Sequence, residues 1–480
     1  MIHIKQTNKI VMKQLFLIVT LLLCNLTYGQ TNQYAEVVNY YHTAKNFNGV
    51  VLVATNGQID YLTGIGVSNR QAGTTMNAKA KFKIASITKT FTAVLILQLY
   101  QQGKIDLNAT IGKYYPTYKG DAKDKVTIEH LLTYSSGIPN TVNTLGMRPY
   151  QLPLTIDEFI DNYCSENLEF TPGEKSNYSN TEYTILHKII ENVSNKSFSS
   201  LLQENILKPL NMENTGLLNS KDIISGLSSS YTLEDSTNQI TADEPYFIEN
   251  YFGSAAMYST VEDLLTFNNA IFNYRLLNEA TTNLMLQPNT KLGGVALGGL
   301  WYSEGYGTFN KPFIYRTGGL LGSCSNWIHS IEDKKTIIVF NNTNGTNLYE
   351  LSEQLYLVST GQKATLPFLE KQENSSTIVN LDKVKGTWLL DLRPDPTSEP
   401  YLKDFILTPT TGKEFEGEFY GTKFTGGYFN TDWENIYFAF TTGDKDNVYY
   451  HSGYIIDNKI FGISYSEGRK FTSHWTGIKK

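Results

Sequence analysis

Apolar and polar residues follow two patterns along the chain, and each pattern predicts a different kind of element. Residues 49–54 form a continuous apolar run, which is typical of a strand buried on both faces. Asn56-Gly57 follows as a hairpin turn signal, so we expect residues 59–64 to form the partner strand. Over residues 88–102 apolar positions recur at helical spacing, and Gly103 suits the end of that helix.

The same reasoning extends to the rest of the first 362 residues. Helical spacing predicts further helices over 181–194, 197–208 and 260–273, and strand patterns cover 323–331 and 335–341. Strands near both ends with helices between them indicate one sheet assembled from distant parts of the sequence. We therefore expect an α/β fold with a mixed, mostly antiparallel sheet, flanking helices and a helical insert.

The first segment has the pattern of an export signal. A short apolar run over residues 15–24 follows three lysine residues, and small residues precede Gln30. The run is too short to span a bilayer, so we expect residues 1–29 to be a signal peptide and the protein to be periplasmic or secreted. A lipid on Cys24 is the less favoured alternative, because the bulky Leu23 precedes it. We expect no stable membrane span after signal cleavage.

The pattern changes after residue 365. Residues 366–380 are polar and read as a linker between residues 30–365 and residues 381–480. The last segment consists of short alternating strands separated by Gly, Asn and Asp turns, which predicts an antiparallel β-domain built as a small barrel or sandwich. Gly386-Thr387-Trp388 resembles the opening of lipocalin-like barrels.

Composition and charge narrow the range of functions. The chain has 480 residues, 41% hydrophobic and 18% charged, which is a globular balance. Its formal net charge of −6 provides no basic excess for a phosphate backbone, so we expect no nucleic-acid partner. Three cysteines are too few for a disulfide scaffold. Cys164 and Cys324 remain after signal cleavage, either paired as a disulfide or as two buried thiols.

Several common catalytic signatures are missing from the sequence. There is no Gly-x-Ser-x-Gly, which argues against an α/β-hydrolase. There is also no His-Glu-x-x-His and no Cys-x-x-Cys, and the seven histidines are scattered. We therefore expect neither a metal nor an organic cofactor.

One arrangement suited to nucleophilic catalysis is present. Ser86-Ile87-Thr88-Lys89 lies at the start of the helix predicted over 88–102. At that position the N–H of Ser86 is free to face a developing oxyanion. Lys89 lies one turn further along the same face, where it can favour the alkoxide or accept its proton. The alternative is a serine cap on a helix that happens to carry a lysine in its first turn.

A second segment offers partners for this pair. Phe170-Thr171-Pro172-Gly173 makes a turn, and Tyr178 and Asn180 then precede the next predicted helix. A tyrosine close to a lysine can be held as a phenolate or can relay a proton. Asn180 can both donate and accept, which suits the positioning of Lys89 and of a substrate amide.

Together these segments resemble the serine β-lactamase and penicillin-binding-protein superfamily, in particular its class C-like branch. The resemblance covers about residues 36–362. It rests on the Ser86 segment, on residues 126–139, where Tyr134 stands in place of the usual histidine, and on the Phe-x-Pro-Gly…Tyr-Ser-Asn run. Two further landmarks are Lys208-Pro209-Leu210-Asn211-Met212 and Ser259-Thr260-Val261-Glu262-Asp263-Leu264.

The family also carries a Lys/His-Thr/Ser-Gly motif on a strand beside the cleft, and two segments compete for this position. Arg316-Thr317-Gly318-Gly319 is favoured by its order in the chain, whereas His451-Ser452-Gly453 matches the letters but lies in the β-domain. The resemblance implies that Arg316 and Thr317 contact substrate and that the N–H of Gly319 is the second oxyanion donor. Arg316 either grips a substrate carboxylate, or it has a role within the protein, where it pairs with a local acid or supports Tyr178 as a phenolate.

The resemblance implies an exported serine acyl-hydrolase. Ser86, Lys89 and Tyr178 would be catalytic, and Asn180, Arg316, Thr317 and Gly319 would bind a small-molecule or short-peptide substrate. The motifs do not separate peptidase, esterase and true class C-type β-lactamase. A catalytically silent penicillin or peptide sensor is the alternative from another class. The aromatic residues of the β-domain serve either a sugar platform or its core, and the oligomeric state is open.

Overall fold

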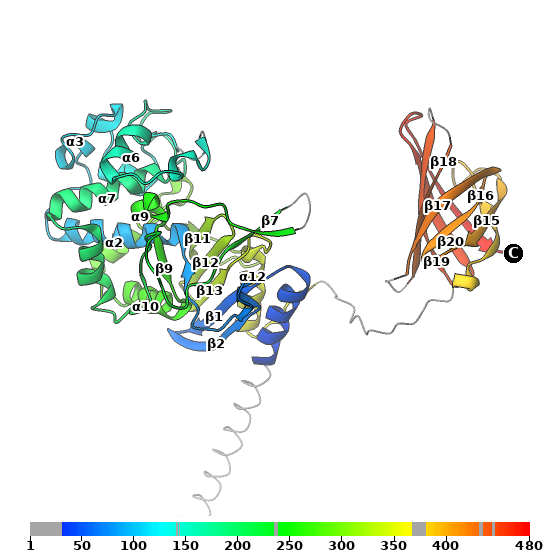
Figure 1. Cartoon of the computed structure of the whole chain (residues 1–480), viewed down its shortest axis with the longest axis horizontal. Coiled ribbons are helices and arrows are strands. Elements are labelled where there is room, and N and C mark those ends of the chain that lie inside the picture. Colours follow the sequence, from blue (N-terminus) through cyan, green and yellow to red (C-terminus); the bar gives the residue numbers. More distant parts are fainter. Residues whose placement is uncertain are drawn as a thin grey trace, which may run out of the picture. The chain divides into compact units, whose positions relative to one another are not determined.

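The computed structural model describes residues 31–140, 143, 145–234, 239–366, 381–431, 435–443 and 447–480. The predicted signal peptide 1–29 and the linker from residue 367 to 380 lie outside the described residues. The described residues up to 366 form one compact unit and those from 381 onward form a second (Figure 1). Within these residues, no helix combines the length and the apolar character needed to cross a membrane.

The first unit is built on a six-stranded antiparallel sheet. Its strand order is β10-β11-β12-β13-β1-β2, so β1 near the start of the chain pairs with β13 near the end of the unit. The strands are β1 (Gly49–Thr55), β2 (Gln58–Ile65), β10 (Trp301–Ser303), β11 (Phe313–Leu320), β12 (Ser323–Ser330) and β13 (Lys335–Asn341). This confirms the prediction of one sheet assembled from distant parts of the sequence.

Alternate residues of β1 pack into two different cores, which is why its whole sequence is apolar. Val50 and Leu52 face a cluster that contains α2 (Thr88–Gln101) and α10 (Val261–Phe272). Val51 and Val53 face a cluster that contains α12 (Leu348–Ser359) and a helix over residues 31–44. The sheet therefore lies between two helical layers (Figure 1).

The helical insert lies between β5 (Phe82–Lys83) and β9 (Met257–Ser259). Its helices are α2, α3 (Ile111–Tyr114), α4 (Ile128–Leu132), α6 (Ile156–Tyr163), α7 (Thr181–Ser194), α8 (Phe198–Leu202) and α9 (Phe252–Ala255). Almost every side chain of α2 is buried, and α7 and α9 both pack against this central helix. The predicted helix over 197–208 is α8 followed by a π-helical turn, Gln203–Leu207.

Short elements complete the first unit. They are β3 (Val67–Asn69), β4 (Thr74–Thr75), β6 (Gly216–Leu217), β7 (Tyr231–Glu234), β8 (Gln239–Ala242), α11 (Glu279–Leu286) and the 3-10 turns Ala85–Ile87, Asp121–Asp124, Arg148–Tyr150, Ile248–Tyr251 and Thr290–Leu292.

Cys164 and Cys324 are both free thiols, so the disulfide alternative is not realised.

The second unit is a closed antiparallel barrel of eight strands, as the β-pattern predicted. Its strands are β14 (Gly386–Asp391), β15 (Leu402–Pro409), β16 (Glu414–Phe419), β17 (Thr422–Asn430), β18 (Ile436–Gly443), β19 (Val448–Ile456), β20 (Lys459–Ser466) and β21 (Phe471–Lys479). β14 pairs with β21 and closes the barrel, which removes both open edges. Phenylalanine side chains with Trp388 and Trp475 fill the interior.

Candidate active site

Ser86 lies in a short turn that follows β5. Residues 85–87 form a 3-10 turn that leads directly into α2. Ala85 has φ 46°, a left-handed conformation that is uncommon for a residue with a side chain and is often found at functional sites. Ser86 is 9% exposed, and its turn packs against β11.

Lys89 lies one helical turn beyond Ser86 and is fully buried. Its Nζ is 3.1 Å from the Oγ of Ser86, 2.6 Å from the Oδ1 of Asn180 and 2.9 Å from the carbonyl oxygen of Ser254. Three acceptors match the three N–H bonds of an ammonium group. Burial nevertheless lowers the pKa of Lys89 to about 8, because a charged amine loses its water shell there.

Tyr178 lies on the other side of the Ser86 hydroxyl. Its phenolic oxygen is 2.6 Å from the Oγ of Ser86 and accepts a hydrogen bond of 3.1 Å from Arg316. Burial by itself raises the pKa of Tyr178, but the positive charges of Lys89 and Arg316 outweigh it and lower the pKa to about 8. Tyr178 can therefore become a phenolate at a pH close to neutral.

Arg316 is buried beneath this cluster and is 2% exposed. Its Nε donates to the carbonyl oxygen of Ser86 at 2.9 Å, and its Nη1 donates to that of Gly299 at 2.8 Å. Together with the bond to Tyr178, every nitrogen of the guanidinium has a protein partner. Of the two interpretations of Arg316, this geometry favours support of Tyr178 over a grip on substrate.

The next residues of β11 divide into a buried and an exposed set. Thr317 and Gly319 are exposed, whereas Gly318 is buried against the Ser86 turn. A Cβ on Gly318 would lie 2.4 Å from the carbonyl oxygen of Ile84, but a Cβ on Gly319 would meet no protein atom within 4 Å. The protein therefore requires glycine at 318, one residue before the position that the resemblance singles out.

Three residues of the cluster had no assigned role in the sequence. Tyr134 is fully buried with its ring centre 5.0 Å from that of Tyr178, and its departure from the usual histidine was the only signal. Burial raises the pKa of Tyr150, from the turn Arg148–Tyr150, well above its usual range, and the nearby amide of Asn180 lowers it by less. Glu182, in the first turn of α7, is fully buried and accepts from the N–H of Ser136; burial raises its pKa well above the usual range.

The competing motif in the barrel serves a different purpose. His451 is buried and bonds to Thr442 at 2.8 Å and to Ser464 at 2.7 Å. Burial lowers its pKa to about 4, so the ring is neutral near pH 7. These contacts hold neighbouring strands together inside the barrel and place the ring among its aromatic side chains.

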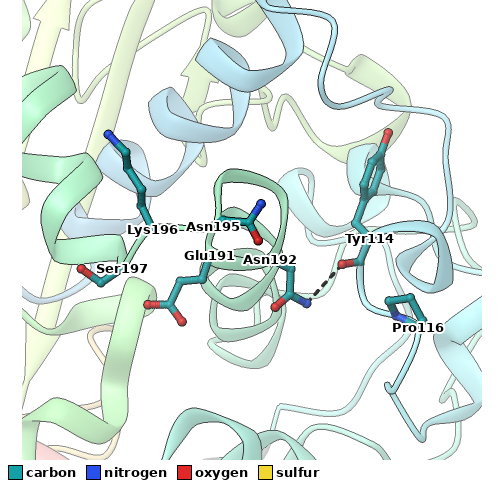
Figure 2. A pocket seen from close by; sticks show the side chains of 7 residues that line it. All are labelled: Tyr114, Pro116, Glu191, Asn192, Asn195, Lys196 and Ser197. Atoms are coloured by element: carbon teal, nitrogen blue, oxygen red, sulfur yellow. Dashed lines mark hydrogen bonds between the residues drawn. The ribbon is translucent and has the colours of Figure 1, made fainter.

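The described residues contain no group of three or more His, Cys, Asp or Glu side chains that could hold a metal ion. A surface hollow is lined by Tyr114, Pro116, Glu191, Asn192, Asn195, Lys196 and Ser197 (Figure 2). It contains none of the residues that surround Ser86, and the side chain of Asn192 is tied to the backbone of Tyr114.

The family model described as Beta-lactamase matches residues 35–361, which is most of the first unit. The chain belongs to the beta-lactamase family. Its match covers β1 to β13 together with the segments that carry Ser86, Lys89, Tyr178, Asn180 and Arg316. Membership of this family supports serine hydrolase activity in general.

Individual relatives agree with this placement. Penicillin-binding protein 4* of Bacillus subtilis is 26% identical over 323 residues, which are 63% of this chain and 70% of that protein. Protein flp of Staphylococcus aureus is 27% identical over 318 residues and 64% of this chain, and the match spans only 61% of that protein's length. The octameric penicillin-binding protein homologue from Pyrococcus abyssi shares the fold, with a TM-score of 0.62 and 21% identity, over 93% of this chain and 99% of that one.

Proposed function

We propose that the protein is an exported serine acyl-hydrolase that forms an acyl-enzyme on Ser86 with an amide, ester or lactam. One observation carries the proposal: the Ser86 hydroxyl lies between the ammonium of Lys89 at 3.1 Å and the phenol of Tyr178 at 2.6 Å. This is the relation between a nucleophile and its base that covalent catalysis requires. The relative named as a penicillin-binding protein supports a substrate with an acyl group of this kind.

Tyr178 is the proton acceptor in the proposed acylation step. Lys89 already directs one N–H to each of three acceptors, so its nitrogen has no lone pair available while it is charged. The proton of Ser86 passes to the phenolate oxygen of Tyr178 as the Oγ–carbon bond forms. The leaving group then takes that proton as its bond to the carbonyl carbon breaks.

The developing negative charge on the carbonyl oxygen needs donors in fixed positions. We propose the backbone N–H groups of Ser86 and Gly319 for this task, since Ser86 lies in the turn before α2 and Gly319 is exposed on the adjacent strand. In deacylation, water attacks the acyl carbon and gives its proton to Tyr178. The same proton returns to the Oγ of Ser86 as the acid leaves.

A panel of substrates tests the proposal. It comprises nitrocefin, short-chain p-nitrophenyl esters, D-amino acid amides and D-Ala-D-Ala peptides. We expect the wild type to turn over at least one class, Ser86→Ala to turn over none with an unchanged unfolding midpoint, and Ser199→Ala, on the exposed face of α8, to match the wild type. Stable binding of penicillin without turnover of any class would instead indicate a silent sensor.

Export is part of the proposal and rests on the first 29 residues alone. Expression with the full leader followed by mass spectrometry of the isolated protein tests it. We expect a mature chain that begins at Gln30 in the periplasmic or secreted fraction. An intact leader in the cytoplasmic fraction would contradict export without affecting the proposed chemistry.

A further inference from the structure

Among the described residues, two cations contact Ser86 directly and a third lies close to it in the sequence, and each is already bound by the protein. Arg316 directs its three nitrogens to Ser86, Gly299 and Tyr178. Lys89 directs its Nζ to Ser86, Asn180 and Ser254. The third cation is Lys83, three residues before the nucleophile.

The side chain of Lys83 is bound by residues far from it in the sequence. Its Nζ donates to the Oγ of Ser230 at 2.9 Å and to the phenol of Tyr246 at 3.0 Å, and it lies 3.8 Å from a carboxylate oxygen of Asp243. Asp243 also accepts from the N–H of Gly322 at 3.0 Å, at the end of the turn between β11 and β12. The charge of Lys83 is therefore paired within the fold.

A substrate carboxylate next to the scissile bond needs a cation with free donors. Arginine recognises such a group through two parallel N–H bonds, and a desolvated carboxylate without a partner is strongly disfavoured. To bind a carboxylate through two N–H groups, Arg316 would have to break its hydrogen bonds to the two backbone carbonyls and to the phenol of Tyr178, whose ionisation it supports. The phenolate 3.1 Å away also offsets part of its charge.

The exposed residues of the strand beside the nucleophile are neutral. Thr317 and Gly319 present a hydroxyl and backbone groups but no charge. Such a strand recognises an extended substrate through neutral hydrogen bonds. A carboxamide can both donate and accept such bonds, and an ester can accept them. Both groups therefore suit this strand equally well.

We infer that the Ser86 site selects acyl donors without a negative charge next to the scissile bond, namely peptide amides and uncharged esters, over the corresponding free acids. This inference rests on the proposed function, because it concerns the substrate of that same site. It also sets the protein apart from an enzyme that trims a free carboxyl terminus.

Matched substrate pairs test the inference. The first pair is N-acetyl-D-Ala-D-Ala and its C-terminal amide, and the second is a phenyl ester and its 3-carboxyphenyl counterpart with the same acyl group. We expect kcat/KM to favour the uncharged member by about tenfold or more, the size of one lost hydrogen bond to a charged group. Equal rates, or a preference for the acid, would overturn the inference while leaving the Ser86 chemistry intact.

Two variants test separately whether Arg316 or Lys83 binds a substrate carboxylate. Arg316→Gln is expected to lower kcat/KM for both members of a pair by the same factor, because Arg316 acts through Tyr178. A loss confined to the charged member would show that Arg316 grips the carboxylate. Lys83→Gln is expected to leave the ratio between the members unchanged, and a changed ratio would identify Lys83 as the receptor. If no substrate in either pair is hydrolysed in a Ser86-dependent way, the inference is overturned, because it names amides and esters as the substrates. The proposed function fails only if the wider panel, nitrocefin included, is also left intact.

Discussion

At the scale of single residues, the distinctive feature is a hydroxyl shared between two groups that each ionise near the same pH. The pKa of Lys89 falls to about 8 because it is buried, and that of Tyr178 falls to about 8 because Lys89 and Arg316 are close. Two such groups lose their protons as a coupled pair. In the proposed mechanism the reactive pair has lost one of its two protons, with the remaining proton on Lys89 and Tyr178 as the phenolate.

Replacement of the phenol measures its share of this chemistry. Tyr178→Phe keeps the ring that packs against Tyr134 but removes the proposed base. We expect kcat to fall about 10²–10⁴-fold, the usual contribution of general base catalysis, while KM changes much less. Steady-state kinetics on the best substrate decide the matter, and a variant that keeps half its activity would make Lys89 the base and Tyr178 structural.

The pH dependence follows from the same pair. Below about pH 8 both groups are protonated and Ser86 has no acceptor, so kcat/KM should rise with pH through that value. Loss of the second proton at higher pH should lower it again. Arg316→Gln removes a positive charge beside Tyr178, raises its pKa and should move the rising limb to higher pH. The test is the pH profile of kcat/KM, measured over a full range of substrate concentrations. A rising limb at the same pH in the variant as in the wild type would contradict the role given to Arg316.

The sequence was informative about these residues to different degrees. Ser86, Lys89, Tyr178 and Asn180 were proposed from local motifs, and the structure brings all four together. The two interpretations of Arg316 could not be separated, because its partners at Ser86 and Gly299 are set by tertiary packing and not by spacing along the chain. Tyr150 and Glu182 gave no signal, since an ordinary tyrosine and a helix-start glutamate look structural.

At the scale of elements, the site depends on close contact between β11 and the Ser86 turn. A Cβ on Gly318 would approach the Oγ of Ser325 and the oxygen of Ile84 to 2.4 Å, so Gly318→Ala must push the turn away. We expect a loss of about 1–3 kcal/mol in the free energy of unfolding and a fall in kcat/KM of about 10²-fold, as for a catalytic group displaced by about 1 Å.

Gly319→Ala is the matched control for this contact. It adds the same methyl group one residue further on, where it meets no protein atom, so the free energy of unfolding should change by less than about 0.5 kcal/mol. Chemical denaturation of both variants checks the comparison. Equal destabilisation by the two substitutions would show that the strand, and not its contact with the Ser86 turn, is sensitive.

Long elements were predictable because the spacing of their apolar residues indicates both the type of element and the face that is buried. The run 49–54 became β1, and 181–194 matches α7. The left-handed Ala85 and the two-residue strands β5 and β6 could not be predicted, because alanine rarely adopts that conformation and two residues carry no period. These short features nevertheless fix where Ser86 lies.

At the scale of the whole molecule, the catalytic residues and the barrel belong to separate compact units with separate cores. Removal of residues 366–480 should therefore leave a folded protein that is still acylated at Ser86. Circular dichroism and labelling of the truncated chain test this expectation. An insoluble or unfolded product would mean that the two units depend on each other and that the boundary proposed from the sequence is misplaced.

The central claim is that Ser86 is acylated, and identification of the modified residue tests it most directly. The full chain is treated with a fluorophosphonate and, separately, with a penicillin, and the adduct is located by peptide mass spectrometry. We predict one adduct on Ser86, absent in Ser86→Ala and slowed in Tyr178→Phe. An adduct on another serine, or none on the folded protein with either reagent, would contradict the account.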